Sequence, residues 1–134
     1  MPIDKYSSVT YTNAISPHDI AATGTITGKV IDTAGYRSNT FIFHAGIQSV
    51  NVTTVTPVIL SGSTTASLAS CDAAELIGTE AAAATILGAT LTTGICAAIG
   101  YIGTDRYVRC DLTVAGAATG FYSAVLAQAD AIKK

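Results

Sequence analysis

The chain has 134 residues, a length typical of a single domain that buries a core without disulfides or metals. Only 12% of its residues are Asp, Glu, Lys or Arg, about half the share found in typical soluble domains, and the net charge is −2. This composition argues against proteins that attract nucleic acid or an anionic membrane through a basic surface. Two long segments, Arg37 to Asp72 and Glu80 to Asp105, carry no full charge between their ends, so we expect neighbours in an assembly to cover much of the surface.

The first 19 residues, "MPIDKYSSVTYTNAISPHD", contain two of the three prolines together with Tyr6 and Tyr11. We interpret residues 1–19 as an extended N-terminal arm that adds an edge strand or reaches onto a neighbouring protein. A floppy terminus is the alternative. No apolar segment typical of a secretory signal is present in this stretch. Residues 20–134 are predicted to form one domain.

Residues 24–32, "GTITGKVID", show the period-two alternation and β-branched residues of a strand. The alternation assigns Ile26 to one face and places Thr25, Thr27 and Ile31 on the other. The following "DTAGY" predicts a turn that contains a glycine.

Two further strands are predicted before residue 63. In "SNTFIFHAG", Phe41 and Phe43 lie on one face, with Ile42 and His44 on the other. The segment "VNVTTVTPVILSG" is rich in Val and Thr, and Pro57 has no N–H to donate to a neighbouring strand. We therefore expect Pro57 at a sheet edge or a bulge.

Helical structure is expected in one short stretch. In "SCDAAELIG", Asp72 and Glu75 have the spacing of a capping box, and Gly78 ends the turn. The segment "TEAAAATILGATL" is ambiguous, because its alanines favour a helix whereas Thr85, Ile86 and Gly88 favour a short element at best. The uncharged window 81–103 is long enough to cross a bilayer, but its Thr and Gly residues favour packing inside the domain.

Three strands are predicted after residue 93, in "GICAAIGYIG", "RYVRCDLTV" and "GFYSAVLAQA". The second alternates most clearly, with four apolar residues (Val108, Cys110, Leu112 and Val114) on its inner face. Arg109 and Asp111, two residues apart on the outer face, are expected to form an ion pair. Six to eight short strands, separated by turns, predict an all-β fold: an antiparallel β-sandwich, jelly-roll or immunoglobulin-like, with one short helix.

Few residues offer chemistry. Cys71, Cys96 and Cys110 form no CxxC motif and are expected to be buried free thiols, with an intersubunit disulfide as the alternative. His18 and His44 have no second ligand at a suitable spacing, so we expect no metal site and no cofactor. No nucleophile elbow or phosphate-binding loop occurs, and we expect no enzymatic activity.

Five fragments occur in an order that resembles a family of small structural proteins of tailed bacteriophages: "IDTAGYRSNTF", "VTPVIL", "DAAELIGTEAA", "IGYIGTDRYVRCDLTVAG" and "SAVLAQA". The resemblance covers residues 30 to 127. It implies a virion protein of the capsid decoration, or cement, type with a β-sandwich fold and no catalytic residue. The segment "SGSTTASLASC" and the ending "QADAIKK" depart from the family pattern, which leaves the contacts of that loop and of the C-terminus unassigned.

We therefore expect a decoration protein that binds the outer surface of a phage head, is located in the virion, and stabilises the lattice of the major capsid protein. A homotrimer is expected, with no nucleic-acid or membrane partner. The expected contact residues are Tyr6, Tyr11, Tyr107, Arg109 and Asp111. The alternative is another virion subunit, or a carbohydrate- or receptor-binding module of a tail or fibre.

Overall fold

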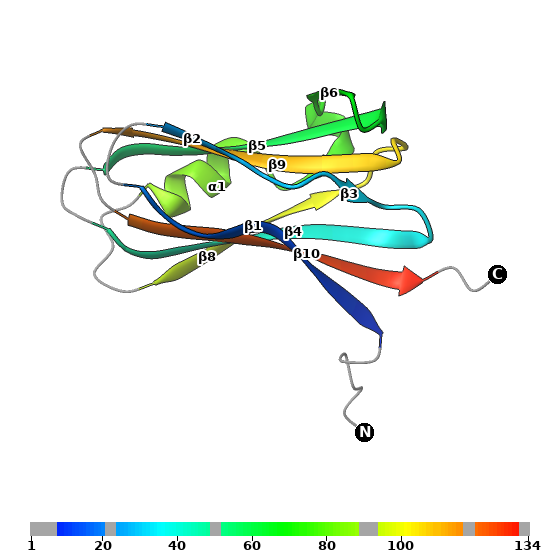
Figure 1. Cartoon of the computed structure of the whole chain (residues 1–134), viewed down its shortest axis with the longest axis horizontal. Coiled ribbons are helices and arrows are strands. Elements are labelled where there is room, and N and C mark those ends of the chain that lie inside the picture. Colours follow the sequence, from blue (N-terminus) through cyan, green and yellow to red (C-terminus); the bar gives the residue numbers. More distant parts are fainter. Residues whose placement is uncertain (1–7, 21–23, 49–51, 89–93, 117–119, 132–134) are drawn as a thin grey trace.

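Two antiparallel sheets pack face to face in the computed structural model, which describes residues 8–20, 24–48, 52–88, 94–116 and 120–131 (Figure 1). Sheet A contains, in spatial order, β1 (Val9–Ile20), β10 (Gly120–Ala131), β4 (Tyr36–Gln48), β8 (Ile95–Tyr101) and β7 (Leu76–Ile77). Sheet B contains β2 (Gly24–Thr27), β9 (Tyr107–Gly116), β5 (Val52–Thr64) and β6 (Ser67–Ser70), with β3 (Ile31–Asp32) also paired to β9. The predicted antiparallel β-sandwich is confirmed.

The core lies between the two sheets and follows the predicted alternation. Phe41 and Phe43 of β4 are fully buried, and their rings lie 6.4 Å apart. Full burial of a side chain of this size contributes about 1.5–3 kcal/mol relative to its exposed state. Tyr122, Ala124 and Leu126 of the neighbouring β10 belong to the same layer. The facing layer is supplied by inward residues of β9 and β5 in sheet B, namely Val108, Cys110, Leu112, Val114, Val55 and Ile59.

The predicted strand 24–32 is interrupted, and the face assigned to Ile31 is wrong. Thr27 pairs with Asp111, and Ile31 pairs with Val108. The segment from Thr27 to Ile31 therefore advances by four residues while β9 advances by three. One extra residue reverses the alternation and turns Ile31 into the core, where it is 5% exposed. Gly28 permits the distortion, because a Cβ atom there would stand 2.0 Å from the carbonyl oxygen of Cys110.

The turn between β3 and β4 contains the predicted glycine. The N–H of Tyr36 donates to the carbonyl of Thr33 at 3.1 Å, and Gly35 has a φ of +91°. This is the conformation that favours glycine at the third position of a type II turn.

Pro57 lies on a stretch of β5 that no described strand borders on one side, as predicted for a sheet edge, and its side chain is fully buried. It pairs with Leu112 of β9, whereas β6 pairs with β5 only from Leu60 onward. The nearby N–H of Ile59 points away from β9 and donates to Glu80 Oε1 at 2.7 Å. Pro57, two residues earlier, has its nitrogen on the same side, where no ladder hydrogen bond is lost.

Two short helices follow β6. The predicted helical turn is the 3₁₀ helix η1 (Ala73–Glu75), in which the carboxylate of Glu75 accepts the N–H of Asp72 at 3.0 Å. The ambiguous segment forms α1 (Glu80–Leu87), which begins where Thr79 Oγ1 accepts the N–H of Ala82. Among the described residues, no helix is long and apolar enough to cross a membrane.

Helix α1 closes one lateral edge of the sandwich by packing against β5 and β8 (Figure 1). Its Ala83 and Leu87 are buried in the core. On the opposite edge, residues 9–19 of the expected N-terminal arm belong to β1, the edge strand of sheet A, while residues 1–7 lie outside the described residues.

Candidate interaction surfaces

The five expected contact residues do not form one surface. Tyr11 is 60% exposed and pairs with Ala127 on the outer face of sheet A. Tyr107, Arg109 and Asp111 lie on β9, on the outer face of sheet B. Tyr6 lies outside the described residues. The sandwich therefore separates Tyr11 from the three β9 residues by its full thickness.

Arg109 and Asp111 form the predicted ion pair. Arg109 Nη2 donates to Asp111 Oδ2 at 2.9 Å, and the two side chains are 25% and 16% exposed, so the pair is more buried than a typical surface pair. The second carboxylate oxygen accepts the N–H of Gly28 at 3.1 Å, which ties the β2–β3 bulge to β9. Arg109 Nε is buried without a hydrogen-bond partner.

A second ion pair extends this polar surface towards β3. Arg106 donates through Nε and Nη2 to both oxygens of Asp32, and its guanidinium lies 5.2 Å from the ring centre of Tyr107. The hydrogen bond from Arg106 lowers the pKa of Asp32 below its ordinary value. We call the set Asp32, Arg106, Tyr107, Arg109 and Asp111 the polar ridge.

The outer face of sheet A differs in kind. On its three central strands β10, β4 and β8, none of the described outward residues carries a full charge. We call this surface the neutral face and define it by Thr40, Ile42, His44, Cys96, Ala98, Gly100, Phe121, Ser123, Val125 and Ala127. No strand pattern predicted this face, although the two uncharged segments contain β8 and all but the first two residues of β4.

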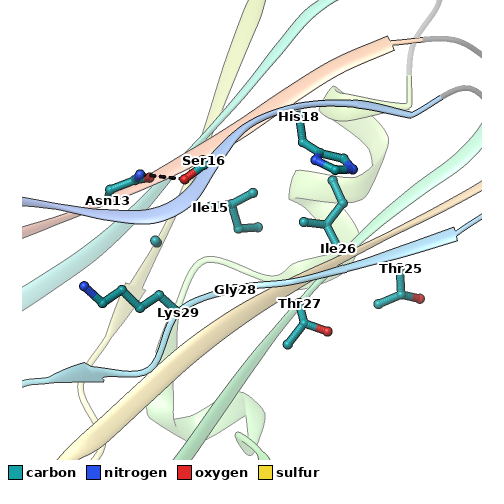
Figure 2. A pocket seen from close by; sticks show the side chains of 10 residues that line it. Asn13, Ile15, Ser16, His18, Thr25, Ile26, Thr27, Gly28 and Lys29 are labelled. Atoms are coloured by element: carbon teal, nitrogen blue, oxygen red, sulfur yellow. Dashed lines mark hydrogen bonds between the residues drawn. The ribbon is translucent and has the colours of Figure 1, made fainter.

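A groove of about 680 Å³ opens at the lateral edge opposite α1, between β1 and β2 (Figure 2). Asn13 donates to Ser16 at 2.9 Å on one wall, and the N–H of Lys29 donates to the carbonyl of Ala14 at 2.8 Å across it. Pro17 and two shifts of pairing register interrupt β1 along this edge. These features protect an edge strand against pairing with a further strand.

The three cysteines have different environments, and the expectation that all are buried is wrong. Cys110 is fully buried on the inner face of β9, and this burial raises the pKa of its thiol to about 12. Cys71 is half-buried, and burial also raises its pKa. Cys96 is exposed because its position on β8 faces outward, on the neutral face. All three are free thiols.

A partly buried polar cluster joins β5 to the segment before β9. Ser61, 5% exposed, donates to Asp105 Oδ2 at 2.9 Å, and the N–H of Asp105 donates to the hydroxyl of Tyr101 at 3.1 Å. These bonds fix the start of the polar ridge to the core. Within the described ranges, no group of three His, Cys, Asp or Glu side chains is placed to hold a metal ion.

Comparisons with known proteins identify a shared fold. No protein-family model matches the sequence, and no curated protein matches it. The structure is similar to that of the PBSX exported protein XepA, with a TM-score of 0.57 and 12% sequence identity over 99% of this chain. The match covers 40% of the XepA chain, so this chain spans about two fifths of its length.

The SPBc2 prophage-derived protein YomS shows a weaker likeness, with a TM-score of 0.38 and 12% identity over 91% of this chain and 95% of that one. Because the identity to XepA is only 12%, that likeness concerns the fold and not the surface chemistry. The chain is a two-sheet β-sandwich that shares its fold with part of an exported protein of PBSX.

Proposed function

We propose that this chain is a structural protein of a phage virion that decorates the outer surface of the capsid and acts by binding, not by catalysis. The observation that carries the proposal is the neutral face, an uncharged sheet surface flanked by the exposed side chains of Tyr11 and Ile77. A soluble protein that exposed such a surface alone would be prone to association. A subunit with neighbours in a symmetric shell would have it covered.

The sequence resemblance to phage structural proteins supports this role, and the fold is shared with part of XepA, an exported protein of PBSX. A cement protein stabilises a shell by mass action, since it binds the assembled lattice and not the dissociated subunits. In this proposal the polar ridge contacts the major capsid protein. In that contact the ring of Tyr107 packs against the capsid protein as an apolar surface, and the Arg109–Asp111 pair offers hydrogen-bonding groups to it.

The alternative of a carbohydrate-binding module has less support. Such modules display flat aromatic platforms, but Tyr101 is 2% exposed, and Tyr107 is partly covered by the guanidinium of Arg106. In the described part of the chain, the tyrosine that remains most exposed is Tyr11, on the opposite face.

The proposal is tested by sedimenting the purified chain with undecorated heads of the phage that encodes it. We expect saturable binding and heads that resist heat better than undecorated ones. The double variant Tyr107→Ala, Arg109→Ala should bind at least about tenfold more weakly, because interface aromatic and arginine residues contribute most of the binding energy. Thr25→Ala, at an exposed position of the same sheet, is the matched control and should bind like the wild type.

Two outcomes contradict different parts of the proposal. If the wild-type chain does not sediment with heads, the decoration function is wrong. If the wild type and the double variant bind equally well, decoration stands and the assignment of the polar ridge to the capsid contact is wrong.

A further inference from the structure

The neutral face is uncharged, and it also has raised and recessed positions. Across sheet A the pairing aligns one row of residues: Tyr11, Ala127, Thr40, Gly100 and Ile77. The first and last of these are 60% and 62% exposed, while the three between them are small. The row is therefore a shallow trough with a raised side chain on each flank.

A projection lies further along the same strand. Phe121, on β10, is 60% exposed and stands beside Gly46, whose missing side chain leaves the ring without a bulky neighbour there. Phe121 and Ala127 are six residues apart on one face of β10, a separation of roughly 20 Å. The neutral face thus carries a knob and a trough at opposite ends of one strand.

We propose that the neutral face binds the same face of a second copy of this chain, in a two-fold symmetric pair. This inference rests on the proposed function, because it names the neighbour that covers the neutral face in the assembly. A two-fold axis that crosses β10 between Ser123 and Val125 brings Phe121 of each copy over Ala127 of the other. The knob then enters the trough twice, once in each direction.

Charge also selects this occupant. A partner that placed Lys, Arg, Asp or Glu on the neutral face would bury charges without partners there, because none of the described outward residues of β10, β4 and β8 is charged. A second neutral face adds no charge of its own, and the charged residue beside it is the exposed Asp19 of β1, which pairs with Phe121 at the rim of the face. The polar ridge, with its two ion pairs, does not suit the same position.

The available area is sufficient. The three strands of the neutral face together with the flanking β1, about 4.8 Å apart and roughly ten residues long each, give a projected area of about 650 Å². Stable interfaces bury about 800 Å² of accessible surface on each partner, and side chains that protrude add to the projected value. Two flat sheets that pack face to face also reproduce the way in which sheets A and B already pack on each other.

A two-fold pair differs from the trimer expected from the sequence. A trimer needs a heterologous contact between two different patches, whereas a face that fits itself closes after two copies. In the proposed assembly, the pair leaves both polar ridges pointing outward, free for the capsid.

The test is the native mass of the purified chain, measured by light scattering and sedimentation velocity from low to high micromolar concentration. We expect a dimer of the wild type, twice the 13.6 kDa of the single chain. Phe121→Ala removes the knob, and Ala127→Lys places a charge in the trough; each should weaken association by at least about tenfold. Thr56→Lys, which puts the same charge at an exposed position of sheet B, should leave the dimer intact.

A readout that needs no variant follows from Cys96. Its thiol lies on the neutral face and is exposed in the single chain, so a dimer should protect it from a thiol reagent at high protein concentration and release it on dilution. A wild type that stays monomeric, a trimeric mass, or equal effects of Ala127→Lys and Thr56→Lys would each overturn the proposed pair. If the chain is a monomer that still binds heads, the two-fold pair is wrong, but the decoration function stands.

Discussion

The two outer faces of this sandwich are built from similar alternating strands but differ in what they present. Sheet B carries two ion pairs, Asp32–Arg106 and Arg109–Asp111, along β3 and β9. The three central strands of sheet A present Thr, Ser, Ala, Gly, aliphatic and aromatic side chains, and no described outward residue there is charged. Charged side chains are well solvated in water, but their burial in a dry contact is costly, so this difference favours different surroundings for the two faces in the proposed assembly.

The largest expected effect is on the backbone of sheet B. In Gly28→Ala, the new Cβ would collide with the carbonyl of Cys110, and backbone atoms cannot move aside as a flexible side chain would. We expect a loss of unfolding free energy of about 3 kcal/mol, measured by urea denaturation. Gly46→Ala on sheet A is the matched control, since its Cβ meets Phe121 Cβ at an ordinary 3.4 Å, and it should lose less than about 1 kcal/mol. Equal losses would show that Gly28 has no special role in the bulge.

A smaller effect is expected where the polar ridge is partly buried. Asp111→Ala leaves the Gly28 N–H and the Arg109 guanidinium without their acceptors, so we expect a loss of about 2 kcal/mol. Asp32→Ala, which breaks the more exposed pair with Arg106, should cost clearly less. Urea denaturation of the two variants distinguishes them. If Asp32→Ala is the more damaging, the ranking of the two pairs by burial is wrong.

The smallest effect is a pH dependence at the exposed end of the ridge. Since Arg106 holds the pKa of Asp32 below its ordinary value, the ionised carboxylate stabilises the folded chain. This stabilisation is full above the unfolded pKa of about 3.9 and is lost as the pH falls through the lower folded pKa. Asp32→Asn should therefore flatten the acid decline of the melting temperature slightly.

Asp72→Asn serves as the control for this titration, because Asp72 has no ion-pair partner within the described residues. This variant removes a carboxylate without breaking an ion pair, so it measures the effect of the substitution alone. An Asp32→Asn variant with an unchanged acid decline would mean that the Arg106 pair does not couple to folding.

Much of the fold was predictable because the alternation of apolar and polar residues within each strand determines which side chains face the core. In β9, the inward set and the outward Arg109–Asp111 pair follow directly from period two. Ile31 was placed wrongly, since the extra residue near Gly28 depends on a close approach to Cys110 that no local pattern records. Helix α1 was ambiguous for a similar reason: the Leu87 side chain is stabilised by packing against the sandwich, in a segment whose own preference is weak.

The candidate surfaces were harder to predict than the strands. Tyr11 and Tyr107 were both expected to make contacts, but no sequence pattern showed that they face opposite ways, because β1 joins sheet A and β9 joins sheet B. The expectation that Cys96 is buried failed because β8 turns that position outward, beside His44 of β4.

The sequence by itself determined that the chain forms short alternating strands with an apolar inner side, few charges and a glycine turn at Gly35. These features depend on neighbours along the chain, and the backbone geometry of a strand expresses them directly. Only the tertiary structure decided which strands lie side by side, and therefore which outward residues gather into the polar ridge and which into the neutral face. Period-two alternation states whether a side chain points in or out, but the choice of partner strand is made by long-range packing.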